Sequence, residues 1–227
     1  MGFGTRSELK KEIRKGSVSV GGEVVKDAGF NVSADSEVRY KGEAVGYEEF
    51  VYYMLNKPAG VISASDDPFE QTVVDLIDEQ KRRDLFPTGR LDRDTEWLLL
   101  ITNDGALAHR LLSPRHHVDK TYYVKVSGIL TAEDADAFAH GLSLPDGLDC
   151  MPAELRILSS CASESTSEAE VTIREGKFHQ IKRMFSALGK EVTYLKRLSM
   201  GTLCLDPSLE PGDYRRLTDE ELQMLRG

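Results

Sequence analysis

The sequence predicts an α+β fold in which a mixed, largely antiparallel sheet is flanked by helices. Candidate strands outnumber candidate helices, the two kinds of element are interleaved, and they do not repeat with the strand–helix–strand period of a parallel α/β protein. The 227 residues are enough for one large domain or for a small module attached to a larger one, and either can bury a core.

The first expected element is a short basic helix. Residues 5–8 (TRSE) form a capping-box pattern, apolar residues follow at helical spacing, and Gly16 ends the helix. Residues 18–25 are typical of two short strands around a Gly-Gly turn. Helix and hairpin fit one compact unit, whose basic side chains either suit contacts to a phosphate backbone or form a solvated helix face. These side chains are Arg6, Lys10, Lys11, Arg14 and Lys15.

A change of composition divides the chain into two parts. Residues 41–49 are polar and contain glycine, which is typical of a boundary, so we expect one part at residues 1–46 and another at residues 50–227. The second part opens with a strand, FVYYMLNKP, that ends in a turn at Pro58 and Gly60. Residues 72–77 are expected to form a capped helical turn.

Residues 88–105, TGRLDRDTEWLLLITNDG, are the most informative stretch. A turn that starts at glycine carries Arg90 and Asp92, and five apolar residues then predict a buried strand that runs into an Asn-Asp-Gly turn. A charged turn feeding a buried strand holds a carboxylate rigidly. Without further context, Asp92 and Asp94 are either turn residues chosen for local hydrogen bonds or a carboxylate pair like that of glycosidases.

The remaining elements follow from periodicity and capping. Residues 178–188 place apolar side chains at i, i+3, i+4 and i+7, which predicts a helix with one buried stripe beside Lys182 and Arg183. The serine-rich residues 159–167 are expected to form a mobile linker. Further helices are expected at residues 106–112, at 131–140 and from 218, and further strands at 121–126, 142–144, 154–158, 170–174, 192–198 and 203–205.

Charge and missing motifs restrict the function. The net charge is −9, but residues 174–197 hold seven basic and two acidic side chains, a local surplus of five that suits nucleic acid. The sequence has no P-loop, GxGxxG, HExxH or GxSxG motif. Its three cysteines form no CxxC pair, and it has neither a membrane-spanning apolar run nor a signal peptide. We therefore expect a cytoplasmic protein without a metal, and a monomer.

Three separated segments together resemble the family of pseudouridine synthases that modify ribosomal RNA. They are LNKPAGV at residues 55–61, TGRLDRDTEWLLLITNDG at 88–105 and REGKFHQIKRMF at 174–185, with KTYYV at 120–124 in the expected order. The resemblance covers essentially everything after residue 50. The segment SPRHHVDKTY at residues 113–122 is most similar to sequences of the RsuA-type branch, which acts on small-subunit (16S) rRNA.

The N-terminal part carries a second resemblance. Residues 5–25, TRSELKKEIRKGSVSVGGEVV, look like the RNA-binding module shared by a small-subunit ribosomal protein and many RNA-modifying enzymes. That module normally opens with a further helix of the form RLDKYLA. We do not find this helix in the sequence, so we expect the module to lack its first helix.

The resemblance implies the pseudouridine synthase fold and an isomerisation of uridine that needs no cofactor. Asp92 matches the family's invariant aspartate, which attacks the ring or the anomeric carbon, or assists departure of the base. Tyr122 matches a tyrosine that stacks on the target base, and Lys182 matches a basic residue that pairs with the aspartate. Arg90 matches a position that fills the space left by the extruded base. The expected partner is small-subunit rRNA or its assembly intermediate, with Lys57, Lys177 and Arg183 as further RNA contacts.

One position departs from the family pattern. The family usually has glycine where this chain has Trp97, so the large indole must displace a neighbour or point outward. This departure motivates a rival hypothesis, an RNA-binding assembly factor with an inactive catalytic fold. A synthase for large-subunit rRNA is a second rival. A third is a nucleoside or sugar hydrolase that uses Asp92 and Asp94.

Overall fold

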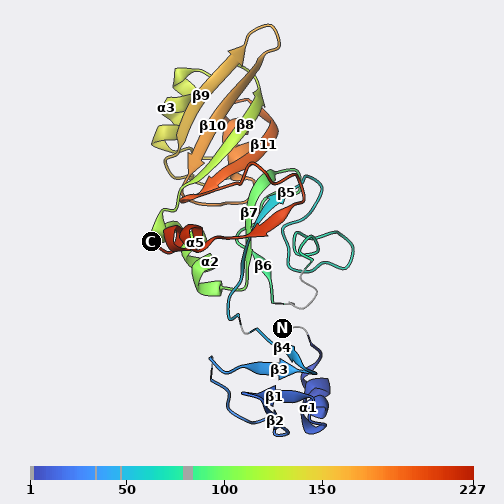
Figure 1. Cartoon of the computed structure of the whole chain (residues 1–227). Coiled ribbons are helices and arrows are strands. Elements are labelled where there is room, and N and C mark those ends of the chain that lie inside the picture. The colour runs from blue at the N-terminus through green and yellow to red at the C-terminus, as the bar shows by residue number, and fades with distance from the viewer. Residues whose placement is uncertain (1–2, 34, 47, 79–83) are drawn as a thin grey trace. The chain divides into compact units, whose positions relative to one another are not determined.

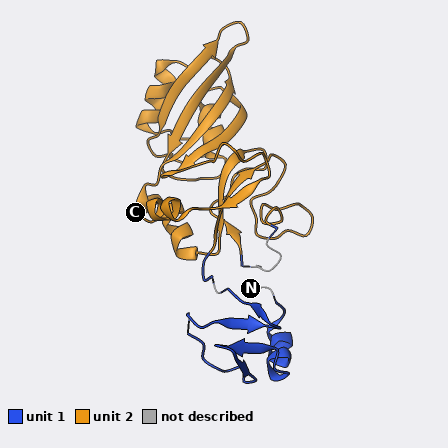
Figure 2. Cartoon of the chain, viewed as in Figure 1, with its two compact units in different colours: residues 1–50, 78–84 blue, residues 51–77, 85–227 orange. Residues whose placement is uncertain are grey.

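The computed structural model describes residues 3–33, 35–46, 48–78 and 84–227 (Figure 1). The chain separates into two compact units (Figure 2). One contains residues 1–50 and 78–84, and the other contains residues 51–77 and 85–227.

The N-terminal unit contains the predicted helix and hairpin. The helix α1 (Arg6–Arg14) begins with a capping box, in which the Thr5 amide donates to the Glu8 carboxylate at 2.8 Å and the Glu8 amide donates to the Thr5 hydroxyl at 3.3 Å. Four short strands form a sheet in the order β2-β1-β3-β4. They are β1 (Val18–Val20), β2 (Glu23–Val25), β3 (Val38–Tyr40) and β4 (Glu43–Ala44).

The second unit is built on a sheet of nine strands. Seven follow one another in the order β13-β5-β7-β11-β8-β10-β9, while β12 pairs with β11 and β6 pairs with β7. Within the described residues, β7 and β11 form the one parallel strand pair, so the sheet is mixed and largely antiparallel as predicted. The strands are β5 (Tyr52–Lys57), β6 (Phe86–Pro87), β7 (Glu96–Thr102), β8 (Lys120–Ser127), β9 (Glu154–Cys161), β10 (Thr166–Ile173), β11 (Glu191–Met200), β12 (Leu203–Cys204) and β13 (Tyr214–Arg216).

Helices flank this sheet, again as predicted. Their bounds are α2 (Gly105–Leu112), α3 (Ala132–His140), α4 (Gln180–Ala187) and α5 (Asp219–Arg226), with a short 3₁₀ helix η1 (Pro114–His116) after α2. Asp104 caps α2, because its carboxylate accepts from the Leu107 amide at 3.0 Å. None of the described helices is both long and apolar enough to cross a membrane.

The central strands β5 and β7 are buried on both faces. Alternate residues contribute to different hydrophobic clusters: Leu55 and Leu99 belong to the larger cluster, which also includes Phe185 of α4. Met54 and Leu98 belong to a second cluster with residues of α2 and α5. The polar turn that precedes β7 is therefore joined to a strand that packs in the core on both faces.

The prediction of a linker at residues 159–167 was wrong. These residues belong to a β-hairpin, in which β9 and β10 continue to the pair Cys161–Thr166 and only residues 162–165 turn. The end of β9 is exposed, so polar serines occupy it and hide the strand pattern.

Residues 72–77 form a capped turn as predicted: the Asp75 carboxylate accepts from the Thr72 amide at 2.8 Å, and the Asp75 amide donates to the Thr72 hydroxyl at 3.3 Å. The prediction of a strand at residues 142–144 was wrong, because Ser143 makes only an isolated bridge to Asp149. That segment is too short for periodicity to distinguish a turn from a strand.

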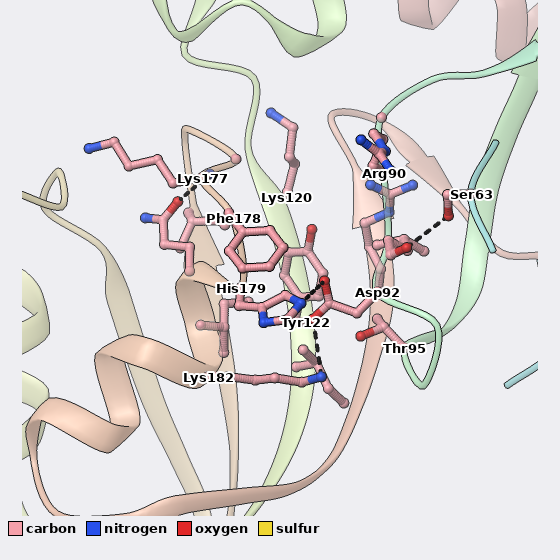
Figure 3. Close-up of a pocket in the computed structure, with 18 of the residues that line it drawn as sticks. Ser63, Arg90, Asp92, Thr95, Lys120, Tyr122, Lys177, Phe178, His179 and Lys182 are labelled. Carbon is pink, nitrogen blue, oxygen red and sulfur yellow. Dashed lines mark hydrogen bonds and ion pairs between the residues drawn. The ribbon is translucent and has the colours of Figure 1, made fainter. Parts of the chain in front are cut away.

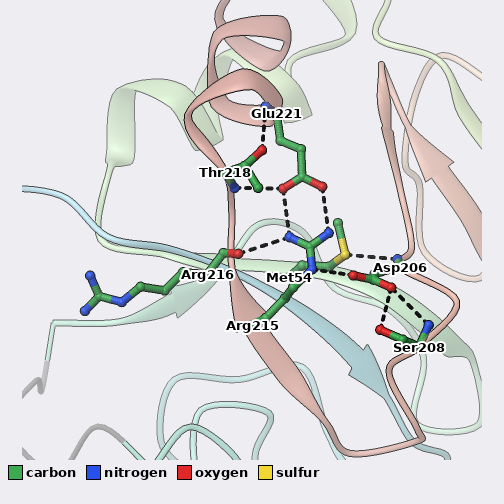
Figure 4. A network of polar contacts seen from close by, with 7 residues as sticks. All are labelled: Met54, Asp206, Ser208, Arg215, Arg216, Thr218 and Glu221. Atoms are coloured by element: carbon green, nitrogen blue, oxygen red, sulfur yellow. Dashed lines mark hydrogen bonds and ion pairs between the residues drawn. The ribbon is translucent and has the colours of Figure 1, made fainter.

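A polar network ties β13 to the C-terminal helix (Figure 4). The Arg215 guanidinium donates to Asp206 at 2.6 Å and to both oxygens of Glu221 at 2.8 Å. The same Glu221 accepts from the Thr218 amide at the start of α5. One arginine thus fixes the end of β13, the loop after β12 and the first turn of α5.

Candidate active site

A pocket of about 570 Å³ opens in the second unit, within the size range of small-ligand sites. Its walls come from the turn before β7, from β8 and β11, and from the segment that leads into α4. Figure 3 shows Asp92, His179 and Lys182 converging beside Tyr122. Segments that are far apart in the sequence therefore meet at one carboxylate.

The Asp92 turn is held in place by a buried lysine. The side chain of Lys57 is 0% exposed, and its ammonium donates to the backbone carbonyls of Thr95 at 2.8 Å, Pro58 at 3.0 Å and Arg93 at 3.2 Å. Burial lowers the pKa of Lys57 to about 8, although the charges of nearby carboxylates oppose this. The prediction that Lys57 contacts RNA was therefore wrong, because an ammonium with no exposed surface cannot reach a phosphate.

Lys182 bridges the two aspartates of the turn. Its Nζ lies 3.1 Å from Asp92 Oδ2 and 2.6 Å from Asp94 Oδ1. Burial opposes the charge of Lys182, but hydrogen bonds to Asp94 and Asp92 outweigh burial and raise its pKa. For Asp94, burial is likewise outweighed by the hydrogen bond and charge of Lys182, so the pKa of Asp94 is lowered. The Asp92 side chain is far less exposed than that of Asp94, at 19% against 71%.

Tyr122 and Arg90 lie on the same pocket. Tyr122 is buried in β8, opposite Arg197 of β11 and Val171 of β10, and its side chain lines the cavity. Arg90 is exposed at the pocket and, within the described residues, makes no ion pair or hydrogen bond. The structure therefore brings together Asp92, Lys182, Tyr122 and Arg90, which the sequence singled out.

Of the other predicted RNA contacts, only Lys177 lines the pocket among the described residues. Lys177 lines the pocket but is paired with Glu175 at 2.9 Å, and Arg183 is absent from the pocket lining and pairs with Asp146. The predicted basic contacts of the N-terminal unit lie on or directly after α1, and none of them is buried: Arg6, Lys10, Arg14 and Lys15. These residues belong to the N-terminal unit, whereas the pocket residues belong to the second unit.

Three pocket residues were missed by sequence reasoning. One is His179, whose backbone is left-handed, with a φ of 49°. Its ring stacks on that of Phe178, with 3.8 Å between the ring centroids, and its Nε2 lies 3.5 Å from Asp92 Oδ1. Lys120 and Arg197 line the pocket although both are buried. A signal existed for Lys120, because it lies two residues before Tyr122 and so shares its face of the strand.

Trp97 adopts a backbone conformation that favours glycine. Its φ is 77°, in the left-handed region that L side chains rarely occupy. The half-buried indole packs against Lys196, whose Nζ lies 3.4 Å from the ring centroid, and Trp97 is absent from the pocket lining. The indole therefore places strain in β7 without obstructing the pocket.

These groups define the chemistry that the pocket supports. A partly buried carboxylate beside an ammonium can act as a nucleophile or stabilise positive charge. The neighbouring aromatic ring offers a flat surface for a planar ligand. Within the ranges that the structure describes, no three His, Cys, Asp or Glu side chains group as they do around a metal ion.

Comparison with known proteins gives matches over both parts of the chain. The family described as RNA pseudouridylate synthase matches residues 51–187, and the S4 domain matches residues 1–38. The chain is 48% identical over 226 residues to the uncharacterized RNA pseudouridine synthase YtzG of Bacillus subtilis, covering 99% of this chain and 94% of that protein. It is 40% identical over 220 residues to the ribosomal small subunit pseudouridine synthase A of Escherichia coli K12, covering 96% and 93%. A crystal structure of a pseudouridylate synthase superposes with a TM-score of 0.72 at 39% identity, covering 97% of this chain and 94% of that one.

Proposed function

Because the chain belongs to the RNA pseudouridylate synthase family and is an RNA-modifying enzyme of that kind, we propose that it converts a uridine of small-subunit rRNA to pseudouridine with Asp92 as the catalytic aspartate. The reaction breaks the bond between ribose C1′ and N1 of the base and forms a bond between C1′ and C5. A proton leaves C5 and N1 gains one, so the product is an isomer of the substrate.

The observation that carries this proposal is the ion pair between Asp92 and Lys182 inside the pocket. The carboxylate needs its charge whether it attacks the ring, attacks C1′ or assists departure of the base. Lys182 places a compensating positive charge 3.1 Å from the carboxylate, and the Lys57 ammonium fixes the backbone of the turn. The carboxylate is thus preorganised before substrate binds.

Tyr122 supplies the surface on which the target base stacks. Its ring is largely buried in the core of the sheet and also lines the pocket. A base that rotates between bond breaking and bond forming needs a flat contact that does not fix one orientation by hydrogen bonds. Tyr122 also assists removal of the proton from C5.

Arg90 occupies the space that the target base leaves in the RNA. Extruding a base from structured RNA costs a few kcal/mol of stacking, and a side chain that enters the vacated position offsets part of that cost. The exposure of Arg90 at the pocket, with no partner among the described residues, supports this role.

RNA is held by two further surfaces. The exposed cations of α1 contact phosphates in the manner expected of an RNA-binding module, which the match of residues 1–38 to the S4 domain supports. Lys177 and Arg183 contribute near the pocket. Residues 1–46 then form the RNA-binding module, and residues 50–227 form the catalytic domain.

The choice of small-subunit rRNA is supported by the Escherichia coli relative, whose name gives the ribosomal small subunit as its target. Incubating the protein with naked 16S rRNA, small subunits and 23S rRNA, followed by mapping of carbodiimide-reactive uridines, tests this choice. A new reactive uridine in 16S rRNA or in small subunits supports the proposal. A new site in 23S rRNA alone contradicts it.

A further inference from the structure

Two cations are buried in the wall of the pocket. Lys120 is 3% exposed and Arg197 is 2% exposed, yet both side chains line the cavity. They come from neighbouring strands, because β8 pairs with β11 and Arg197 lies opposite Tyr122, two residues from Lys120. In Figure 3 Lys120 extends to the side of Tyr122 opposite Lys182, as does Arg90.

Neither cation has a carboxylate partner within the described part of the chain. Lys120 Nζ donates to the Val118 carbonyl at 3.0 Å, and Arg197 Nε donates to the Leu98 carbonyl at 2.8 Å. Arg197 Nη2 is buried and has no hydrogen-bond partner among these residues. The other lysines that line the pocket differ, because each has an acidic partner: Lys182 pairs with Asp92 and Asp94, and Lys177 pairs with Glu175.

This arrangement is unfavourable in the free protein. A buried charge costs free energy unless an opposite charge or hydrogen bonds compensate it. Burial lowers the pKa of Lys120, the charge of Arg197 lowers it further, and Asp119 only partly opposes them. An anion bound between the two cations offsets their mutual repulsion and the cost of burying their charges.

A glycine lies beside the Arg197 guanidinium at the pocket. Gly89 has a φ of +93°, which favours glycine, and a Cβ there would lie 3.0 Å from Leu112 Cδ2 and 3.9 Å from Arg197 Nη1. The Gly89 backbone therefore lies closer to Leu112 than a larger residue would allow. Arg90 follows directly in the chain and is likewise unpaired among the described residues.

We propose that Lys120 and Arg197 form an anion site that binds the phosphodiester group next to the target uridine. The Arg197 guanidinium keeps N–H groups that have no partner among the described residues, and the Lys120 ammonium supplies a compact second charge. This inference rests on the proposed function, because it assumes that RNA enters the pocket. An extruded nucleotide brings its own phosphates to the pocket, whereas the uracil ring carries no charge that requires two cations.

The test uses the full-length protein and the variant Lys120→Gln. A labelled 16S rRNA transcript is titrated at several KCl concentrations, and the slope of log K against log[KCl] is measured. Loss of one phosphate contact is expected to reduce the steepness of this slope by about 0.7 to 0.9 and to weaken binding by about tenfold at low salt. Lys120→Arg keeps the charge and is expected to keep the slope.

Lys125→Gln is the matched control. Lys125 lies on the same strand, is exposed and pairs with Glu168, and does not line the pocket. Its substitution is expected to leave the slope unchanged. An equal change of slope in Lys125→Gln and Lys120→Gln overturns the proposal, because the effect then reflects net charge and not the pocket.

A second measurement locates the phosphate. Short RNAs that contain the mapped uridine carry one neutral methylphosphonate linkage at successive positions. We expect one linkage beside the uridine to weaken binding to the wild-type protein and to have no effect on Lys120→Gln. If every linkage weakens RNA binding by both proteins equally, the site does not bind that phosphate.

Inorganic phosphate, exchanged for chloride at constant ionic strength, tests whether the site binds the free anion. If the wild-type protein binds phosphate and no methylphosphonate linkage affects RNA binding, the assignment of the site to RNA is overturned.

A structural role for Lys120 gives a different result. If Lys120 only supports the fold, Lys120→Gln lowers stability in urea and leaves the salt slope unchanged, which overturns the proposal. The proposed function fails separately: if no RNA acquires pseudouridine but the slope changes as expected, the pocket binds an RNA phosphate through Lys120 and the proposed function is rejected. If pseudouridine forms and the slope is unaffected, the function stands and the anion site is rejected. Arg197→Gln is less suitable as the main variant, because Arg197 bonds to the backbone of β7.

Discussion

The ammonium of Lys182, on α4, lies 3.1 Å from the carboxylate of Asp92, which stands in the turn before β7. We expect Lys182→Met to lower the rate of pseudouridine formation by about 100-fold, as removal of one charge-stabilising group typically does. RNA affinity should change little. Single-turnover kinetics with saturating enzyme separate the two quantities. Lys182→Arg, which keeps the charge, should recover most of the lost rate, and equal rates in both variants would contradict the role of charge.

Asp94 shares Lys182 with Asp92 but is largely exposed. An exposed ion pair contributes between 0 and about 1 kcal/mol, so Asp94→Asn should change the rate by less than about tenfold. The same kinetic assay checks this. Loss of activity as complete as in an Asp92 variant would instead favour a two-carboxylate hydrolase, and release of free base or sugar would identify it.

Trp97 has a positive φ, which predicts a difference between two small replacements. Trp97→Ala loses the contact with Lys196 and keeps the left-handed strain, whereas Trp97→Gly loses the same contact and relieves the strain. The glycine variant should therefore be more stable than the alanine variant by about 1 kcal/mol in urea unfolding. Both should form pseudouridine, because Trp97 does not line the pocket. An alanine variant as stable as the glycine variant would contradict the strain.

Lys57 supports the Asp92 turn through three backbone carbonyls. Lys57→Met leaves these acceptors without their donor, so we expect it to lower the free energy of unfolding at pH 7 by at least about 2 kcal/mol. The loss should also reduce the rate, because the turn carries Asp92. Urea unfolding of the wild type and the variant measures the first effect.

The difference in unfolding free energy between the wild type and Lys57→Met should change with pH in a definite direction. The pKa of Lys57 is about 8 in the folded protein and 10.5 at its ordinary value. Between these pH values the unfolded chain binds a proton that the folded protein has released, so wild-type stability rises with pH relative to Lys57→Met. This gain is complete above pH 10.5 and is lost as the pH falls through about 8. A constant difference across this range would show that the pKa of Lys57 is not lowered.

The sequence predicted the regular elements well where their patterns are strong. The capping box of α1, the apolar run of β7 and the stripe of α4 follow from local rules of capping and periodicity. The β9–β10 hairpin was missed because its serine-rich end is exposed, so no alternation marks it. Short strands such as β4 and β6 depend on tertiary pairing and leave no pattern of their own.

The candidate site was only partly predictable. Asp92, Tyr122 and Lys182 follow from a family resemblance, because periodicity cannot show that three distant segments share a pocket. Lysine is usually exposed, so nothing in the sequence indicated that Lys57 is completely buried. Arg197 lies on a predicted strand and Lys120 directly precedes one. Their proposed role depends on the absence of acidic partners in the part of the chain that the structure describes, which sequence patterns do not show.

Replacing Asp92 by asparagine tests the central claim most directly. Wild-type protein and Asp92→Asn are each incubated with small subunits and 16S rRNA, and carbodiimide-reactive uridines are mapped, while RNA binding is measured in parallel. The asparagine keeps the size of the side chain and removes its charge. We predict a new reactive uridine with the wild type, none with Asp92→Asn, and nearly equal RNA affinity. Appreciable product from Asp92→Asn would contradict the assignment of Asp92 as the catalytic aspartate.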